Sequence, residues 1–287
     1  MNKAADNKLE ELETDLLLEA IFRYYGYDFR GYEPGIVRLR IREAMMASRI
    51  PTISRFQDRV LHEPAFLERF VQTFSGPEVA MFSDAGFYRS FRTTVIPLLK
   101  TYPFARIWYA GCSTGQGVYS MAIVLREEGI GARCRIYATD LSEQAIRDAR
   151  RGAYPASLFD AYSANYSQSG GAKSFSDYCK RARNRMLMDP SLKTNIVFSE
   201  HNLATDGSFN EFQLIVFREA LGSLNHTLRA RVDRLIYDSL SRLGILALNA
   251  GESLDSMPHE ASYRLMDKES GLFQKVHATA LPQACHS

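Results

Sequence analysis

The first part of the chain carries apolar residues at helical spacing. Between Leu9 and Tyr24 they recur every three or four positions, which indicates one buried helical face. The same pattern predicts three more helices, over Ile36–Met46, Ile53–Leu61 and Pro64–Phe74. We therefore expect residues 1–76 to form a small all-helical domain.

From residue 77 to residue 287, short apolar runs alternate with helical patterns. The predicted helices are 117–128, Ser142–Arg151 and 226–242, and the predicted strands are Arg106–Ala110, Arg135–Thr139, Asn195–Ser199, Phe212–Phe217 and Gly244–Leu248. This alternation is typical of an α/β domain in which helices cover both faces of a doubly wound, mostly parallel sheet. The stretch 155–194 interrupts it, and we expect a helical or irregular insertion near the mouth of the site.

The strongest chemical signal is the glycine-containing turn Gly111-Cys112-Ser113-Thr114-Gly115, between a predicted strand and a predicted helix. Glycines in such a turn let backbone N–H groups approach a ligand at the helix N-terminus. Asp140 ends the next strand, where a carboxylate can accept hydrogen bonds from ribose hydroxyls. These features predict a nucleotide-type pocket. In the alternative, the turn only packs the helix on the strand and Asp140 caps the helix that starts near Ser142.

Several motifs in order extend this prediction over almost the whole chain. They are Met81-Phe82-Ser83-Asp84, Ile96-Pro97-Leu98-Leu99, the run 106–120, Ala138-Thr139-Asp140-Leu141, Val197–Leu203 and Gly251-Glu252-Ser253-Leu254. With these motifs the chain resembles the chemotaxis-receptor protein-glutamate O-methyltransferases, which use S-adenosylmethionine (SAM). The resemblance implies a SAM-methyltransferase-type fold with an N-terminal helical domain. It implies cofactor binding by Gly111, Cys112, Ser113, Thr114, Gly115, Asp140, Leu141, Asn202 and Leu203, and a catalytic role for Arg218. Taken alone, Asn202 would be a turn residue.

The chain departs from the family's pattern at positions that face the site. The family's Phe-Arg-Asp is Phe82-Ser83-Asp84 here, and its Thr-Gly-Glu-Glu is Thr114-Gly115-Gln116-Gly117. Its Cys-Arg-Asn-Val-Leu-Ile-Tyr-Phe is the run 217–224, which keeps Arg218 but has Glu219 for the Asn and Ser223 for the Tyr. These changes remove an arginine, two carboxylates and a phenol, and a hydroxyl cannot imitate a guanidinium.

Selective loss at the site favours a catalytically impaired methyltransferase relative in bacterial signalling. Such a protein would either still bind SAM or S-adenosylhomocysteine (SAH) or have lost the cofactor. The alternative is a non-catalytic regulatory or protein-interaction module that keeps the fold. A third hypothesis is a pocket reused for another small ligand.

The composition excludes several other classes of protein. The 287 residues carry a net charge of +2, which is too balanced to indicate nucleic acid as a partner. Cys112, Cys134, Cys179 and Cys285 show neither zinc-site spacing nor a disulfide framework, so we predict a cytoplasmic protein. No apolar run is long enough to suggest membrane insertion. The histidines show no metal-site spacing, and we expect His201 to have a packing role.

The predicted second helix carries Arg38, Arg40 and Arg42. Such residues can simply form a solvated face. The resemblance implies instead that a basic helix of the N-terminal domain docks on an acidic receptor coiled coil. We therefore name this helix as a candidate contact for a signalling or receptor-type protein, with salt-sensitive binding.

Overall fold

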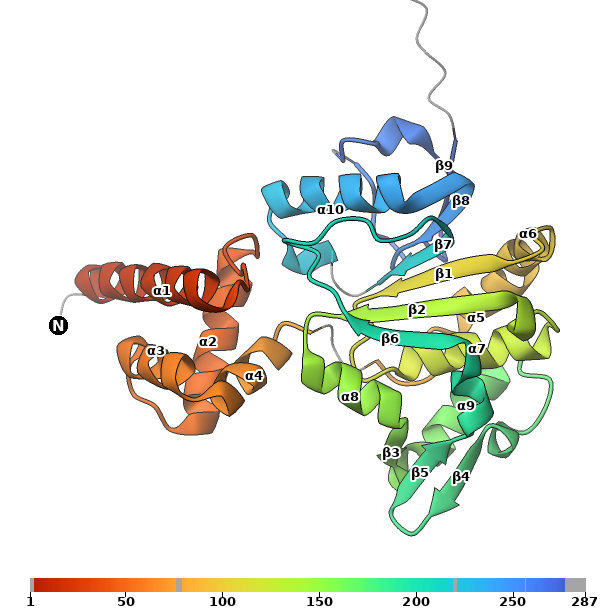
Figure 1. Ribbon diagram of the computed structural model, residues 1–287, viewed down its shortest axis with the longest axis horizontal. Helices are drawn as coiled ribbons and strands as arrows, with labels where there is room; N and C mark the ends of the chain where they lie inside the picture. The colour runs from red at the N-terminus through yellow and green to blue at the C-terminus, as the bar shows by residue number, and fades with distance from the viewer. Residues whose placement is uncertain (1–2, 76–78, 219–220, 256, 277–287) are drawn as a thin grey trace, which may run out of the picture.

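The computed structural model describes residues 3–75, 79–218, 221–255 and 257–276 (Figure 1). Its first part consists of four helices, α1 (Lys3–Tyr25), α2 (Pro34–Ser48), α3 (Ile53–His62) and α4 (Pro64–Gln72). Pro34 opens α2, where a missing N–H is harmless, and Thr52 caps α3 by accepting from the N–H of Arg55. The four predicted helices are confirmed, whereas the predicted domain boundary at 76–77 lies outside the described residues.

The helices pack around a core of their own. Leu17 and Ile21 of α1 meet Ile41 of α2, Phe56 of α3 and Phe70 of α4, all of them buried. Leu17 and Ile21 belong to the apolar pattern predicted for the first helix, but Leu9, Leu12, Leu16 and Tyr24 of the same pattern are exposed. Burial of the core side chains is the main favourable term that holds the four short helices together.

The second part is built on a seven-stranded sheet with the order β6-β2-β1-β7-β8-β10-β9. Neighbouring strands are parallel from β6 to β8, and the pairs β8–β10 and β10–β9 are antiparallel. The bounds are β1 (Ala105–Ala110), β2 (Cys134–Asp140), β6 (Ile196–Glu200), β7 (Phe212–Phe217), β8 (Leu240–Ala247), β9 (Tyr263–Asp267) and β10 (Leu272–Lys275). The predicted parallel-dominated sheet is confirmed.

Helices cover both faces of this sheet, as predicted (Figure 1). Successive residues of β1 point to opposite faces, so Ile107 joins one buried cluster and Trp108 the other. The Ile107 cluster includes side chains of α5 (Ala85–Ser90), α6 (Ile96–Lys100), α7 (Gln116–Glu127) and α8 (Glu143–Arg151). The Trp108 cluster includes side chains of α10 (His226–Ser239). A π-helical turn, Phe91–Val95, joins α5 to α6.

The expectation of a helical or irregular insertion at 155–194 is wrong in one respect. The region contains a helix, α9 (Phe159–Gln168), but also a three-stranded antiparallel sheet of order β3-β5-β4. Its strands are β3 (Ala153–Pro155), β4 (Cys179–Ala182) and β5 (Arg185–Met188). They are short and poor in β-branched residues, and the hairpin turns at Arg183 with φ 52° rather than at a glycine. The usual hairpin signals are therefore missing from the sequence.

The antiparallel pair β9–β10 at the edge of the large sheet was not predicted either. Gly271 makes the turn before β10 at φ 63°, and a Cβ there would lie 2.6 Å from the carbonyl oxygen of Asn249.

Within the described residues, no helix is both long and apolar enough to traverse a bilayer. That part of the chain also shows no cluster of three or more metal-ligating side chains. Cys112, Cys134 and Cys179 are buried free thiols, and Cys285 lies outside the described residues.

Candidate functional site

Four loops meet at the carboxyl edge of the parallel strands. β1 leads into Gly111, β2 ends at Asp140, β6 is followed by Asn202, and β7 is followed by Arg218. The strand order reverses between β1 and β7, because the chain first builds outward to β2 and β6 and then returns to the other side of β1. Open α/β sheets bind ligands at such a switch point. The structure therefore brings the predicted residues to one edge.

The glycine-containing turn is held in left-handed backbone conformations. The φ values are 74° at Gly111, 47° at Ser113 and 92° at Gly115. The N–H groups of Gly111 and Cys112 donate to the carbonyl of Thr139 at 2.8 and 2.9 Å, which ties the turn to β2. A Cβ at Gly115 would lie 2.9 Å from Cβ of Ala149 in α8. Both φ and the available space therefore require glycine at position 115.

Asp140 is the most densely hydrogen-bonded group at this edge. Its side chain is buried, with Oδ2 accepting from the N–H of Ser113 at 2.8 Å. Oδ1 accepts from the N–H of Ser142 at 3.0 Å and from Oγ of Ser75 at 2.7 Å. Burial raises the pKa of Asp140 above its usual value, although these hydrogen bonds act in the opposite direction. Ser142 itself caps α8 by accepting from Ala145, so the helix-cap alternative for Asp140 is wrong.

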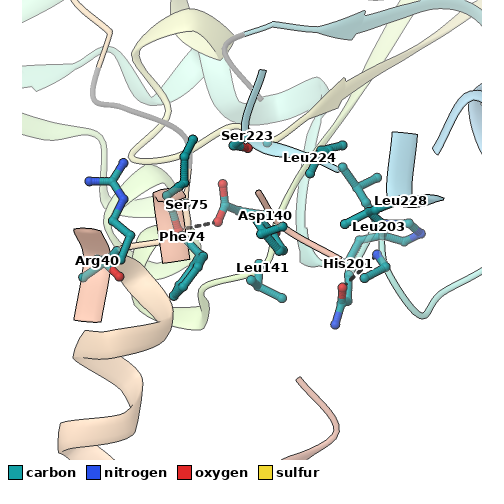
Figure 2. Close-up of a pocket in the computed structure, with 16 residues that line it drawn as sticks. Arg40, Phe74, Ser75, Asp140, Leu141, His201, Leu203, Ser223, Leu224 and Leu228 are labelled. Atoms are coloured by element: carbon teal, nitrogen blue, oxygen red, sulfur yellow. Dashed lines mark hydrogen bonds between the residues drawn. The ribbon is translucent and has the colours of Figure 1, made fainter. Parts of the chain in front are cut away.

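A depression lies between Asp140 and the helical domain (Figure 2). Arg40 of α2 and the segment Phe74-Ser75 border one side, and Leu203, Leu224 and Leu228 border the other. Backbone hydrogen bonds fix the two domains around it. Glu33 N–H donates to the carbonyl of Ser223 at 2.9 Å, and Asn225 N–H donates to the carbonyl of Gly31 at 3.0 Å. The apolar walls with one buried carboxylate suit a flat base attached to a diol. We call this space the nucleoside depression.

Asn202 forms a turn and also lies at the predicted ligand edge. Its Oδ1 accepts from the N–H of Ala204 at 2.9 Å, as in an Asx turn, and the residue also lines the nucleoside depression beside Leu141 and Leu203. His201 is buried and packs edge-on against Trp108, with ring centroids 5.2 Å apart. Its Nε2 bonds to the carbonyl of Gly207 at 3.1 Å, which agrees with the predicted packing role.

A second depression shares Gly111 and is bordered by Cys112 and Ser113. It also contains the departures from the family's pattern at Ser83, Gln116 and Gly117, together with Arg218, Asp84 and Tyr109. We call it the transfer depression. Ser223, another departure, lines the nucleoside depression instead, and Glu219 lies outside the described residues.

Arg218 is already paired inside the transfer depression. Its Nη2 lies 2.6 Å from Oδ2 of Asp84, and its Nε donates to Oδ1 of Asn249 at 3.2 Å. The guanidinium also stacks over Phe87, 4.1 Å from the ring centroid. Burial raises the pKa of Asp84, but the hydrogen bonds from Arg218 and from the N–H of Phe87, together with the nearby positive charges, lower it more, so the pKa lies below the usual value. The pair carries no net charge at neutral pH.

Two predicted cofactor residues shape the turn without lining either depression. Thr114 Oγ1 donates to Oε1 of Gln116 at 2.8 Å, and the Thr114 carbonyl accepts from the hydroxyl of Tyr154 in β3 at 2.8 Å. Gly115 is closed in by Ala149. Ser75 and Tyr109 were not anticipated at the site. Ser75 is 65 positions from Asp140, and no local sequence signal connects the two residues.

The three arginines of α2 do not share one environment. Arg42 forms two hydrogen bonds to Glu10 of α1, at 3.0 and 2.9 Å. Arg40 lines the nucleoside depression and lies 3.3 Å from Glu43, whereas Arg38 borders a groove along α1. Arg40 is therefore placed to act on a ligand of the depression, unlike Arg38 and Arg42.

Comparison with known proteins agrees with this architecture. The family profile described as CheR methyltransferase, SAM binding domain, matches residues 79–270, and the profile described as CheR methyltransferase, all-alpha domain, matches residues 12–75. A putative methyltransferase, Cher3, of Pseudomonas putida is 38% identical over 92% of this chain and 97% of its own length. A chemotaxis protein methyltransferase of Listeria innocua is 26% identical over 86% of this chain and 92% of its own.

Proposed function

This chain belongs to the CheR methyltransferase family, and we propose that it binds the nucleoside part of a SAM-type ligand while transferring methyl groups to protein glutamates slowly or not at all. In a cytoplasmic bacterial signalling pathway, the protein would then act mainly through binding. The observation that carries this proposal is the contrast between the two depressions. The nucleoside depression keeps its acceptor and its apolar walls, whereas the transfer depression has lost the charged groups of the family's pattern.

The residues present fit the nucleoside end of SAM. A carboxylate offers about four lone-pair sites. The N–H groups of Ser113 and Ser142 and the hydroxyl of Ser75 donate to Asp140, and a hydrogen bond from the N–H of Leu141 also lowers its pKa. A ribose diol that donates twice would compete with these donors, and the hydroxyl of Ser75 is the one that it can replace. Leu203 and Leu141 then supply an apolar surface for the base.

The residues do not fit the reacting end equally well. Transfer of a methyl group from a sulfonium to a carboxylate oxygen depends on alignment and desolvation rather than on acid–base catalysis. Alignment of a substrate carboxylate requires a cation that is not already neutralised. Arg218 and Asp84 both match the family's pattern and pair with each other, so the departure lies at Ser83, which offers only a hydroxyl where the family's pattern has an arginine.

Transfer of labelled methyl groups to a chemoreceptor cytoplasmic fragment tests this proposal. An active chemotaxis protein methyltransferase should label the fragment in a parallel reaction, while this chain gives no label above the protein-free blank. Titration with SAH in the same buffer should still give a heat of binding. A labelling rate similar to that of the active enzyme would refute the impairment, and absence of binding of both SAH and 5′-methylthioadenosine, which has the same nucleoside but no amino-acid tail, would refute the nucleoside site.

The alternative of a pure interaction module is supported by the basic side chains of α2, of which Arg42 is exposed and Arg38 is half-buried. If α2 docks on an acidic helical partner, Arg38→Glu with Arg42→Glu should abolish capture of a chemoreceptor fragment at low salt. Arg40→Glu is the matched control, because Arg40 faces the nucleoside depression. It should reduce SAH affinity and leave capture unchanged. Equal loss of capture in both variants would argue against a docking face limited to Arg38 and Arg42.

A further inference from the structure

Tyr109 and Gly117 interlock in the transfer depression. A Cβ at Gly117 would lie 2.7 Å from Cζ of Tyr109 and closer still to its hydroxyl oxygen. The tyrosine ring therefore occupies the space that any side chain at position 117 would need. Gly117 is also the position where the family's pattern has a glutamate, so the lost carboxylate is replaced in space by a neutral phenol.

The neighbouring position offers no substitute for that carboxylate. Gln116 is buried, and its Oε1 already accepts from the hydroxyl of Thr114 at 2.8 Å. Among the described residues that line the transfer depression, Asp84 is the one carboxylate, and it is paired with Arg218 at 2.6 Å. An ammonium group brought here would be desolvated without an anionic partner of its own, which is unfavourable.

The nucleoside depression imposes no such penalty. Asp140 and Asn202 provide polar groups for a ribose and a base, and Leu141 and Leu203 provide apolar contact. A ligand that has an adenosine part but no amino-acid tail would use these contacts in full. It would also leave the Tyr109–Gly117 contact undisturbed.

We propose that this chain selects an uncharged 5′-substituted adenosine, of the methylthioadenosine class, over ligands with an amino-acid tail, and that Tyr109 and Gly117 set this selectivity. The inference rests on the proposed nucleoside site and names its ligand class. Removal of the ammonium and carboxylate from the ligand should not weaken binding, because the described lining of the transfer depression offers them no unpaired charge. In an amino-acid-recognising pocket the same removal would weaken binding greatly.

Calorimetric titration of the full chain with methylthioadenosine, SAH and SAM tests the selectivity. Methylthioadenosine should bind at least as tightly as SAH, and SAM should bind most weakly because its sulfonium adds a positive charge. If SAH binds about tenfold or more tightly than methylthioadenosine, a difference of about 1.4 kcal/mol, the inference is wrong while the nucleoside site stands. If none of the three ligands binds, both proposals fail.

Two variants test the role of the interlocked pair. Tyr109→Ala removes the obstacle, and Tyr109→Ala with Gly117→Glu also restores a carboxylate in the freed space. The ratio of SAH affinity to methylthioadenosine affinity should rise a few-fold in the single variant and about tenfold or more in the double variant. Because each ratio is taken within one protein, a general loss of stability does not produce the effect. An unchanged ratio in Tyr109→Ala, which introduces no clash, would overturn the assignment.

Discussion

The hydrogen bond between Ser75 and Asp140 predicts opposite effects of mutations at its two ends. Ser75 Oγ lies 2.7 Å from Oδ1 of Asp140, at an acceptor site that a ribose diol would need (Figure 2). The ligand must therefore displace Ser75 before it makes both of its own bonds. Ser75→Ala should raise nucleoside affinity, and Asp140→Ala should lower it.

The magnitudes follow from the number of partners that each residue has. A net hydrogen bond is worth about 1 kcal/mol, so loss of the competing Ser75 bond should tighten nucleoside binding by up to about fivefold. Asp140→Ala removes the acceptor for the diol at about 1.5–3 kcal/mol, a loss of about ten- to a hundredfold. It also leaves the N–H groups of Ser113 and Ser142 without their acceptor, at about 1–3 kcal/mol each. Asp140→Ala should therefore also reduce the free energy of unfolding by about 2–6 kcal/mol.

Titration with methylthioadenosine and with SAH, together with chemical denaturation, measures both quantities. Asp140→Asn is the gentler companion variant, because it keeps one acceptor oxygen and should bind weakly while remaining folded. Ser176→Ala is a matched control, since it removes an exposed hydroxyl that bonds only to Ser174 in the insertion. Equal weakening of binding by Ser75→Ala and Asp140→Asn would refute the competition, because Ser75 would then be a ligand contact.

Two further predictions concern stability. Gly115→Ala should lower the free energy of unfolding by about 2–5 kcal/mol, because it adds both left-handed backbone strain and overpacking. Gly26 is the control, since its φ is 80° but no atom lies within 4 Å of an added Cβ. In the same denaturation experiment, Gly26→Ala should therefore show the cost of the backbone strain alone. Glu127→Gln should cost about 3 kcal/mol, because Glu127 accepts from Arg92, Tyr166 and Tyr178 and holds the insertion on the domain. Burial raises the pKa of Glu127, but these hydrogen bonds together lower it more, so its pKa in the folded protein lies below the value in the unfolded chain. The contribution of Glu127 to the free energy of unfolding should therefore be fully present above the unfolded pKa. It should be lost as the pH falls through the lower, folded pKa. A variant whose stability matches that of the unmodified chain from neutral to acidic pH would contradict this role.

Regular periodicity explains what the sequence could predict. The four N-terminal helices and the five parallel strands of the large sheet bury one face or both faces, so their apolar residues indicated the type of each element. The strand ends then place Gly111, Asp140, Asn202 and Arg218 at one edge, because parallel strands end together. Local pattern and topology were sufficient for this part of the site.

The remaining features depend on contacts that local patterns do not encode. The β4–β5 hairpin alternates buried Met186 and Met188 with exposed Arg185 and Leu187, yet none of these residues strongly favours a strand. The Ser75–Asp140 bond depends on how the helical domain meets the sheet. The contact between Tyr109 and Gly117 depends on the path of the turn between them, and Gly117 could be noticed in the sequence only as a missing glutamate.

A retained ion pair and a packing contact explain how the transfer depression keeps its structure. Arg218 would be a buried, unpaired cation if Asp84 did not neutralise it at 2.6 Å, and such a charge is strongly destabilising. A glycine at position 117 would leave a gap beside β1 if the ring of Tyr109 did not fill it. Asp84 and Arg218 are both kept from the family's pattern, so the charge balance is unchanged, whereas the ring of Tyr109 fills the space beside the altered position 117. The nucleoside depression has no comparable substitution at Asp140, whose two backbone donors need a carboxylate whether or not a ligand binds. The stability of the fold therefore requires the same carboxylate that would bind the ribose. Because of this shared requirement, we predict that nucleoside binding is kept after the groups needed for methyl transfer are lost.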